Sequence, residues 1–112
     1  MDMRARTEAM RALAYCTAAC MDRARHHPDP AVRAPNQGRV ELLTPVVKGW
    51  CTESSILIAS TGIQVHGGMG YSKEFHVERY FREARLMRLA PISQEMVLNY
   101  VGEHVLGLPR SY

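Results

Sequence analysis

Residues 62–71 read GIQVHGGMGY and lie between an apolar segment and a charged segment of helical character. Gly67, Gly68 and Gly70 place three glycines within four residues. Glycine adopts backbone conformations with positive φ and allows a main chain to approach a ligand closely. This stretch therefore either ends a helix with a tight turn or presents backbone N–H groups to the phosphate oxygens of a ligand.

Two common phosphate-binding motifs do not fit this turn. The glycine spacing is wrong for a dinucleotide-binding fingerprint, and the Lys-Ser/Thr pair of a Walker loop is absent. Gln64 precedes the glycines and adds a side-chain amide that offers both donors and an acceptor.

Two charged motifs follow the glycine turn, VER at residues 77–79 and REAR at residues 82–85. Together with QVHGGMGY at residues 64–71, they resemble the C-terminal helical domain of the acyl-CoA dehydrogenases. In that family a Gln-x-x-Gly-Gly-x-Gly-Tyr/Phe turn precedes Val-Glu-Arg and then an Arg-Asp-Ala-Lys/Arg helix. The match is in register over these motifs and extends more weakly over the rest of the chain.

The resemblance implies a cofactor and a reaction. Acyl-CoA dehydrogenases use FAD to oxidise an acyl-CoA to a trans-2-enoyl-CoA, and they pass the electrons to an electron-transferring flavoprotein. By resemblance, Gln64, Gly67 and Gly68 meet the ADP part of an FAD that is held mainly by a neighbouring subunit. Gly70 belongs to the same turn, and Ser93 matches a family threonine that approaches the flavin.

The resemblance fails at the catalytic base. Many family members have Tyr-Glu-Gly-Thr-Ser shortly after the Arg-Asp-Ala motif, and that glutamate is the base. Here residues 90–94 read APISQ, so Pro91 occupies the position of the glutamate. Glu95 lies four residues further on, about one helical turn, and is aimed elsewhere. We therefore expect no catalytic base and no metal ligand in this chain.

The family fold also has an N-terminal helical domain and a middle β domain, neither of which this chain resembles. We expect residues 1–112 to be one domain of a longer enzyme and inactive alone. A homo-oligomer or a partner chain would then supply the rest of the fold, including the acyl-CoA site. The alternative is a non-catalytic helical interaction module derived from the same fold.

Composition is ordinary for a folded protein, with 46% hydrophobic residues, 22% charged residues and a formal net charge of +3. No run of like charge suggests a nucleic-acid partner. The apolar runs are too short to span a membrane, and the N-terminus lacks the apolar core of a signal peptide. We expect a cytoplasmic protein.

Apolar side chains recur at steps of three and four over residues 3–26, which predicts a long amphipathic helix. Its predicted buried stripe contains Thr17 and Cys20. Pro28, Pro30 and Pro35 then predict a loop that runs to about Asn36, because proline disfavours helix continuation.

Residues 40–65 keep the same spacing and predict a second packed helix, with a buried seam at Val40, Leu43, Val47, Trp50, Ser54, Leu57, Thr61 and Val65. Thr44 and Pro45 interrupt this helix. Either Thr44 caps a fresh helix there, or the helix kinks.

After the glycine turn, Ser72 is expected to cap a helix with Glu74 in its first turn. Arg79 and Arg82 in this helix either pair with neighbouring glutamates or contact an anion or a subunit. A last helix is predicted from Ile92 to about Leu106, ending at Gly107. The predicted fold class is all-α, an antiparallel bundle of about four helices.

Cys16, Cys20 and Cys51 are an odd number of cysteines in a chain without a secretory signal. We expect free thiols packed in a helical core. Cys16 and Cys20 with His26 and His27 fit no common zinc-site spacing.

Overall fold

The computed structural model describes residues 1–110, and regular structure within them is wholly helical. No strand occurs in this part of the chain, which confirms the all-α prediction. The helices are α1 (Asp2–His26), α2 (Pro30–His66), α3 (Gly68–Tyr71), α4 (Val77–Leu89) and α5 (Gln94–His104).

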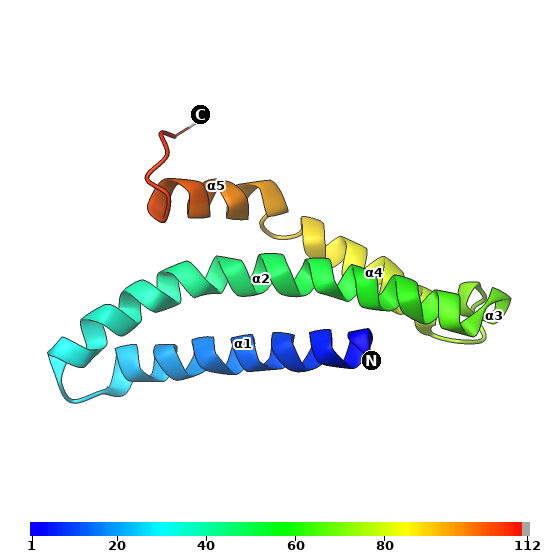
Figure 1. Cartoon of the computed structure of the whole chain (residues 1–112), viewed down its shortest axis with the longest axis horizontal. Coiled ribbons are helices and arrows are strands. Elements are labelled where there is room, and N and C mark those ends of the chain that lie inside the picture. The colour runs from blue at the N-terminus through cyan, green and yellow to red at the C-terminus, as the bar shows by residue number, and fades with distance from the viewer. Residues whose placement is uncertain (111–112) are drawn as a thin grey trace.

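The helix α2 is the centre of the arrangement. Figure 1 shows α1 running antiparallel along one side of α2, with α4 and α5 along another. Apart from Asn36, the buried positions of α1 and α2 hold small side chains, including Thr17 at 7% exposure, Cys20 at 6% and Ser54 at 2%. Small side chains at a helix contact allow the axes to come close together. The predicted buried stripe of α1 is therefore confirmed at Thr17 and Cys20.

The start of α2 corrects one prediction. Asp29 caps the helix, its Oδ1 accepting a hydrogen bond from the Ala31 N–H at 2.8 Å, and Pro30 occupies the first helical position. N–H groups in a first turn have no intrahelical partner, so proline costs little there. The predicted loop to Asn36 is wrong, because the connection ends at Asp29 and Pro35 lies inside the helix.

The helix α2 also continues through Pro45. The Thr44 hydroxyl donates to the Val40 carbonyl one turn earlier, at 2.7 Å, and so does not cap a new helix. Figure 1 shows α2 bowed along its length. Of the two alternatives at Thr44 and Pro45, a new helix or a kink in one helix, the new helix is therefore excluded.

The start of α4 corrects another prediction. Ser72 does not cap α4; its hydroxyl donates to the Met69 carbonyl at 2.9 Å and closes α3 instead. His76 occupies the N-cap position of α4 without a side-chain capping hydrogen bond, so Glu74 lies before the helix rather than in its first turn. A serine hydroxyl that hydrogen-bonds to the backbone carbonyl three residues earlier stabilises a turn, as Ser72 does here with Met69.

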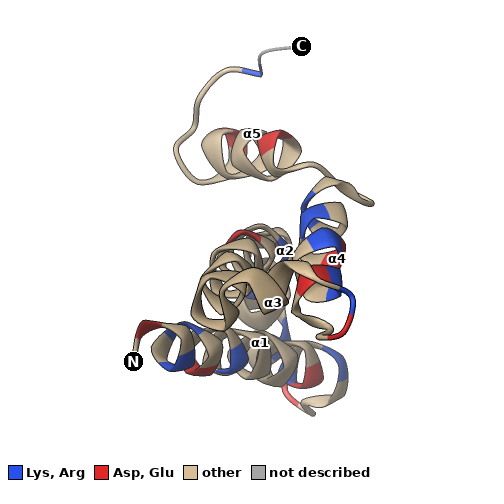
Figure 2. Ribbon diagram, turned by 90° about the vertical axis from the view of Figure 1, so that its right-hand side faces the viewer, with Lys and Arg blue, Asp and Glu red and all other residues tan. Residues whose placement is uncertain are grey.

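Within α4, the predicted intrahelical ion pairs are present. Arg79 pairs with Glu83 at 2.7 Å, and Arg82 pairs with Glu78 at 2.8 Å. In Figure 2, the blue and red parts of the ribbon, which mark charged residues, are concentrated on α1 and α4.

The helix α5 begins two residues later than predicted, at Gln94, because Ser93 is its N-cap and accepts from the Met96 N–H at 3.4 Å. It ends near the predicted place, and Gly107 follows with φ +65°.

Large apolar side chains are exposed over much of the described surface. The predicted seam of α2 is wrong in part, because Trp50, Leu57 and Val65 are exposed even though Ser54 is buried. Further exposed apolar side chains lie on α4 and α5, among them Leu86, Leu89, Met96 and Leu98. The helices of this chain therefore leave parts of the apolar faces of α2, α4 and α5 uncovered. None of the described helices has the length and apolarity required to cross a lipid bilayer.

Candidate functional site

The glycine turn lies at the C-terminal end of α2, at one tip of the elongated molecule (Figure 1). The Gly67 N–H donates to the Gln64 carbonyl at 3.2 Å, which ends the helix. Gly67 has φ +59°, a backbone conformation that residues with a side chain rarely adopt. Gln64, Gly67 and Gly68 are all exposed, so the turn is open to a ligand or to another subunit.

Gly70 differs from the other two glycines because it is buried. A Cβ at this position would lie 2.6 Å from the Ile63 carbonyl oxygen and 2.9 Å from the His66 Cβ. A Cβ at Gly68 would meet nothing within 4 Å. Gly70 therefore allows α3 to fold back against α2, whereas Gly68 keeps the outer surface clear.

His66 and Phe75 support the turn from the side, and the sequence analysis did not single them out. His66 Nδ1 lies 2.9 Å from the Gly62 carbonyl oxygen, and the His66 ring lies 5.6 Å from the Phe75 ring. These contacts connect the end of α2 to the segment before α4. In the sequence, only the four-residue spacing of Gly62 and His66 pointed to one of these contacts, because residues four apart in a helix lie next to each other.

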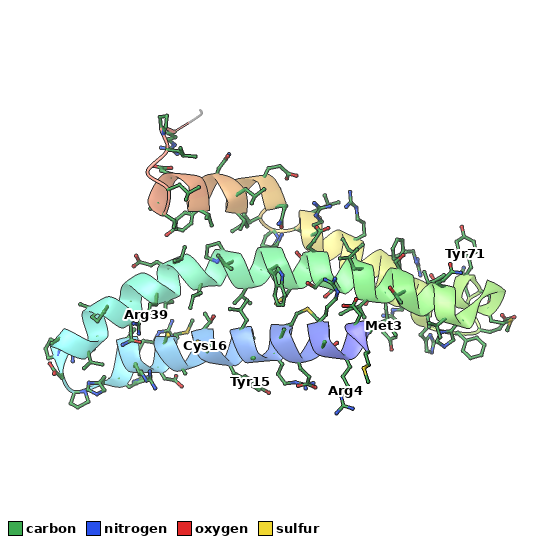
Figure 3. All side chains as sticks on the ribbon, viewed as in Figure 1. Met3, Arg4, Tyr15, Cys16, Arg39 and Tyr71 are labelled. Carbon is green, nitrogen blue, oxygen red and sulfur yellow. The ribbon has the colours of Figure 1, made fainter. Side chains whose placement is uncertain are left out.

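Beside the turn lies a hollow of about 410 Å³, lined by Ile63, Tyr71, Lys73, Glu78, Phe81 and Arg82. Tyr71 projects away from the turn and is 83% exposed (Figure 3). The lining combines the aromatic rings of Tyr71 and Phe81 with the Lys73 ammonium group and with Arg82, which is paired with Glu78. The Tyr71 ring and Lys73 suit a ligand that carries both an aromatic ring and negative charge.

Ser93 lies in the connector between α4 and α5, which we define as residues 90–93. Its hydroxyl oxygen accepts a hydrogen bond from the Met96 N–H at 3.4 Å. The backbone N–H of Glu95, and then the Ser93 hydroxyl, lower the pKa of the Glu95 carboxyl below its ordinary value. A lower pKa makes a weaker base. That Glu95 is not a catalytic base stays a prediction.

The glycine turn and Ser93 do not form one pocket within this chain. They lie at opposite ends of α4, whose 13 residues span about 20 Å. Pro91, at the position of the usual base, lies in the same connector as Ser93 and is exposed. The structure thus brings Gln64, Gly67 and Gly68 together and places Ser93 apart from them.

The cysteines differ in their surroundings. Cys20 is buried and Cys51 half-buried, as expected for thiols in a helical core, but Cys16 is exposed because it lies off the face of α1 that contacts α2. Burial raises the pKa of the Cys51 thiol.

An all-helical chain with an exposed glycine turn and an arginine-rich helix after it is the arrangement expected from the motifs, and a comparison with protein families agrees. The family model for the acyl-CoA dehydrogenase C-terminal domain matches residues 1–106. The chain therefore belongs to the acyl-CoA dehydrogenase family.

Several curated relatives carry that family name or a related one. The chain is 48% identical over 85 residues to a 3-methylmercaptopropionyl-CoA dehydrogenase of Ruegeria pomeroyi, covering 76% of this chain and 14% of the relative. It is 50% identical over 60 residues to acyl-CoA dehydrogenase FadE12 of Mycobacterium tuberculosis, covering 54% of this chain and 16% of the relative.

A third relative is the caffeyl-CoA reductase-Etf complex subunit CarC of Acetobacterium woodii. It is 31% identical over 88 residues, which cover 79% of this chain and 20% of that protein. The chain thus spans between 14% and 20% of the length of these three relatives. No solved structure matches the chain.

Proposed function

We propose that this chain is the FAD-contacting and oligomerisation domain of an acyl-CoA dehydrogenase, an enzyme that oxidises an acyl-CoA to a trans-2-enoyl-CoA. The observation that carries the proposal is the exposed turn at Gln64, Gly67 and Gly68, within a chain that belongs to this family. Residues 1–112 form one domain of the longer enzyme, and the chain alone is inactive.

The residues of the turn fit the ADP part of FAD. Gly67 and Gly68 allow close approach of a pyrophosphate to the backbone, and Gln64 offers an exposed amide. Tyr71 and Lys73 line the adjoining hollow, with an aromatic ring and a cation respectively. Gly70 acts indirectly, because it shapes the turn.

Ser93 is proposed to approach a flavin ring that differs from the FAD at the glycine turn. Ser93 lies about 20 Å along α4 from the glycine turn, and by resemblance the FAD at that turn is held mainly by a neighbouring subunit of a homo-oligomer. When bound, FAD accepts a hydride from the substrate. The group that removes the substrate proton lies outside this chain, because Pro91 has no proton-accepting side chain and Glu95 has a lowered pKa.

The remaining partners belong to the whole enzyme. The acyl-CoA would bind the domains that this chain lacks, supplied by the same polypeptide or by a partner chain. An electron-transferring flavoprotein is the proposed electron acceptor, and the printed name of the A. woodii relative includes an Etf complex. We propose a cytoplasmic location, with no nucleic-acid or membrane partner.

The test is flavin retention by the assembled enzyme, made by co-expressing this chain with a candidate partner chain that carries the remaining domains of the family fold. The variant Gly68→Val adds bulk to the open face of the turn, where nothing else lies within 4 Å. We expect at least about tenfold weaker FAD binding, equivalent to about 1.4 kcal/mol. Gly38→Val is the matched control, because Gly38 is also open but lies far along α2. Equal retention of FAD by the two variants would contradict the proposal.

A second candidate function is a non-catalytic helical interaction module. The exposed apolar side chains of α2, α4 and α5 and the proline at the base position favour it. An assembly that forms stably with its partner but contains no flavin would support this function and reject the first.

A further inference from the structure

The side chain of Lys48 connects α2 to the end of α4 and to the connector. It extends from the middle of α2, and its ammonium group donates to the Arg88 carbonyl at 2.9 Å and to the Ile92 carbonyl. Arg88 lies in the last turn of α4, and Ile92 directly precedes Ser93, the N-cap of α5. One cation thus holds the backbone on both sides of Pro91.

These contacts are favourable for physical reasons. The last carbonyls of a helix have no intrahelical partner, and a cation near a helix C-terminus interacts well with the helix dipole. Hydrogen bonds from a charged donor are also stronger than neutral ones. Lys48 is half-buried, so solvent screens these bonds less than it would on an open surface.

Gly49 adds a close packing contact next to Lys48. A Cβ at Gly49 would lie 3.1 Å from both Gln94 Oε1 and Val97 Cγ1. Val97 is 5% exposed and is one of the most buried apolar side chains in the described chain. The first turn of α5 therefore rests directly on the backbone of α2.

An ion pair adds a third tie between α2 and the end of α4. Arg88 Nε lies 2.8 Å from Glu53 Oε2, although the N–H is not aligned for a hydrogen bond. Lys48, Gly49 and Glu53 together form what we call the connector clamp. All three lie within two turns of α2, opposite residues 88–97.

We propose that Lys48 is a positioning residue that fixes the connector and thereby sets the direction of the Ser93 hydroxyl. Lys48 affects Ser93 because Ser93 directly follows Ile92, whose carbonyl accepts a hydrogen bond from Lys48. The Ser93 hydroxyl also accepts a hydrogen bond from the Met96 N–H, so a shift of the connector moves the whole first turn of α5. The role of Ser93 toward a flavin rests on the proposed function above; the clamp itself does not.

The first experiment measures the clamp in the 112-residue chain by amide hydrogen exchange. We expect Lys48→Met to speed exchange of the amides from Ser93 to Val97 by at least about tenfold, since a tenfold change corresponds to a loss of about 1.4 kcal/mol of local stability. Amides of α1 should be unaffected. Lys73→Met is the matched control, because Lys73 is exposed and lies outside the clamp. Unchanged exchange in Lys48→Met would overturn the clamp.

A second variant tests the same clamp without removing a charge. Gly49→Ala places a Cβ against Gln94 and Val97, whereas Gly38→Ala in the same helix meets nothing within 4 Å. Faster exchange at the start of α5 is expected only in Gly49→Ala. Equal behaviour of the two variants would show that α5 does not rest on Gly49.

The second experiment tests positioning in the flavin-containing assembly. We expect Lys48→Met and Ser93→Ala to shift the flavin absorbance spectrum and the reduction potential in the same direction, both measured on the assembly that retains FAD. The double variant should show the same spectral and potential shifts as each single variant, because both substitutions remove the same interaction of the Ser93 hydroxyl. An unchanged spectrum in Lys48→Met, or full additivity, would overturn the positioning role. An unmodified assembly without flavin would instead reject the proposed function, and hydrogen exchange alone would then decide the clamp.

Discussion

Gly68 and Gly70 lie two residues apart in one turn, yet their surroundings differ. Gly70 is enclosed by the Ile63 backbone and His66, and Gly68 faces open space. A Cβ at Gly70 would meet main-chain atoms, which cannot swing aside as the end of a flexible side chain can. Only the backbone of α2 or α3 could make room for it.

We therefore predict that Gly70→Ala lowers the free energy of unfolding by about 1–3 kcal/mol, the usual cost of overpacking. Gly68→Ala should change it by less than about 0.5 kcal/mol, as expected for a surface position without close neighbours. Urea denaturation of the two variants and the parent chain checks this. Equal stabilities of the two alanine variants would show that α3 does not pack on α2 as described.

The Glu95 carboxylate stabilises the start of α5 through its own backbone N–H and the Ser93 hydroxyl, and its pKa is lowered as a result. A group whose pKa is lowered on folding stabilises the folded chain above its ordinary pKa, and this contribution disappears as pH falls through the lowered pKa. We predict that Glu95→Gln is less stable than the parent at neutral pH and that the two converge in acid. Melting temperatures over this pH range check it, with the exposed Glu74→Gln as a control; a constant difference would contradict it.

The three thiols should react at different rates. Only the thiolate is nucleophilic, and the Cys51 thiol has a raised pKa while Cys20 is 6% exposed. We predict one fast-reacting thiol per folded chain with a disulfide reagent, lost in Cys16→Ser. Three equally fast thiols in the native chain would mean that α2 does not cover Cys20 on the face of α1.

At the scale of the helices, the start of α2 depends on Asp29. Its carboxylate accepts the Ala31 N–H at 2.8 Å. We predict that Asp29→Ala lowers the free energy of unfolding by about 1 kcal/mol, whereas Asp29→Asn retains most of the capping. Asp22→Ala, on the exposed side of α1, is the control. The same denaturation measurement distinguishes the three variants, and a neutral Asp29→Ala would contradict the cap.

Helix existence was predictable from periodic apolar residues, but helix ends were not. Proline at Pro30 and Pro35 favours either a loop or a first helical turn, and the choice depended on the Asp29 cap, which sequence spacing did not reveal. Ser72 had the chemistry of a cap but bonds backwards to Met69. Ser93 was noted for a possible flavin contact, and it also caps α5. Short polar side chains hydrogen-bond to the backbone in either direction, so composition alone cannot distinguish the outcomes.

The candidate site was predictable only in part. Gln64, Gly67 and Gly68 are contiguous, so their grouping follows from the sequence. The burial of Gly70 depends on the folding of α3 onto Ile63, and the reach of Lys48 to Ile92 joins residues 44 positions apart. Contacts of this kind come from tertiary packing, which neither periodicity nor motif spacing encodes.

At the scale of the whole molecule, the exposed apolar side chains of α2, α4 and α5 are the main feature. Large exposed apolar patches mark interaction surfaces. We predict that the 112-residue chain alone binds the dye ANS strongly and associates with increasing concentration, and that assembly with its partner abolishes most dye binding. Fluorescence and sedimentation velocity check this. A monomeric chain that binds no dye would show that these side chains are covered in solution.

The length of α2 has a consequence for the spacing of its two functional regions. Its 37 residues extend about 55 Å, close to the 55 Å long axis of the molecule. Lys48 and Gln64 lie about 24 Å apart on an uninterrupted stretch, since all three prolines of α2 precede Lys48. One inserted residue there would rotate the glycine turn by about 100° relative to the connector clamp, whereas seven would restore its phase almost fully. The length of α2 thus determines both the distance and the relative rotation between the connector clamp and the glycine turn.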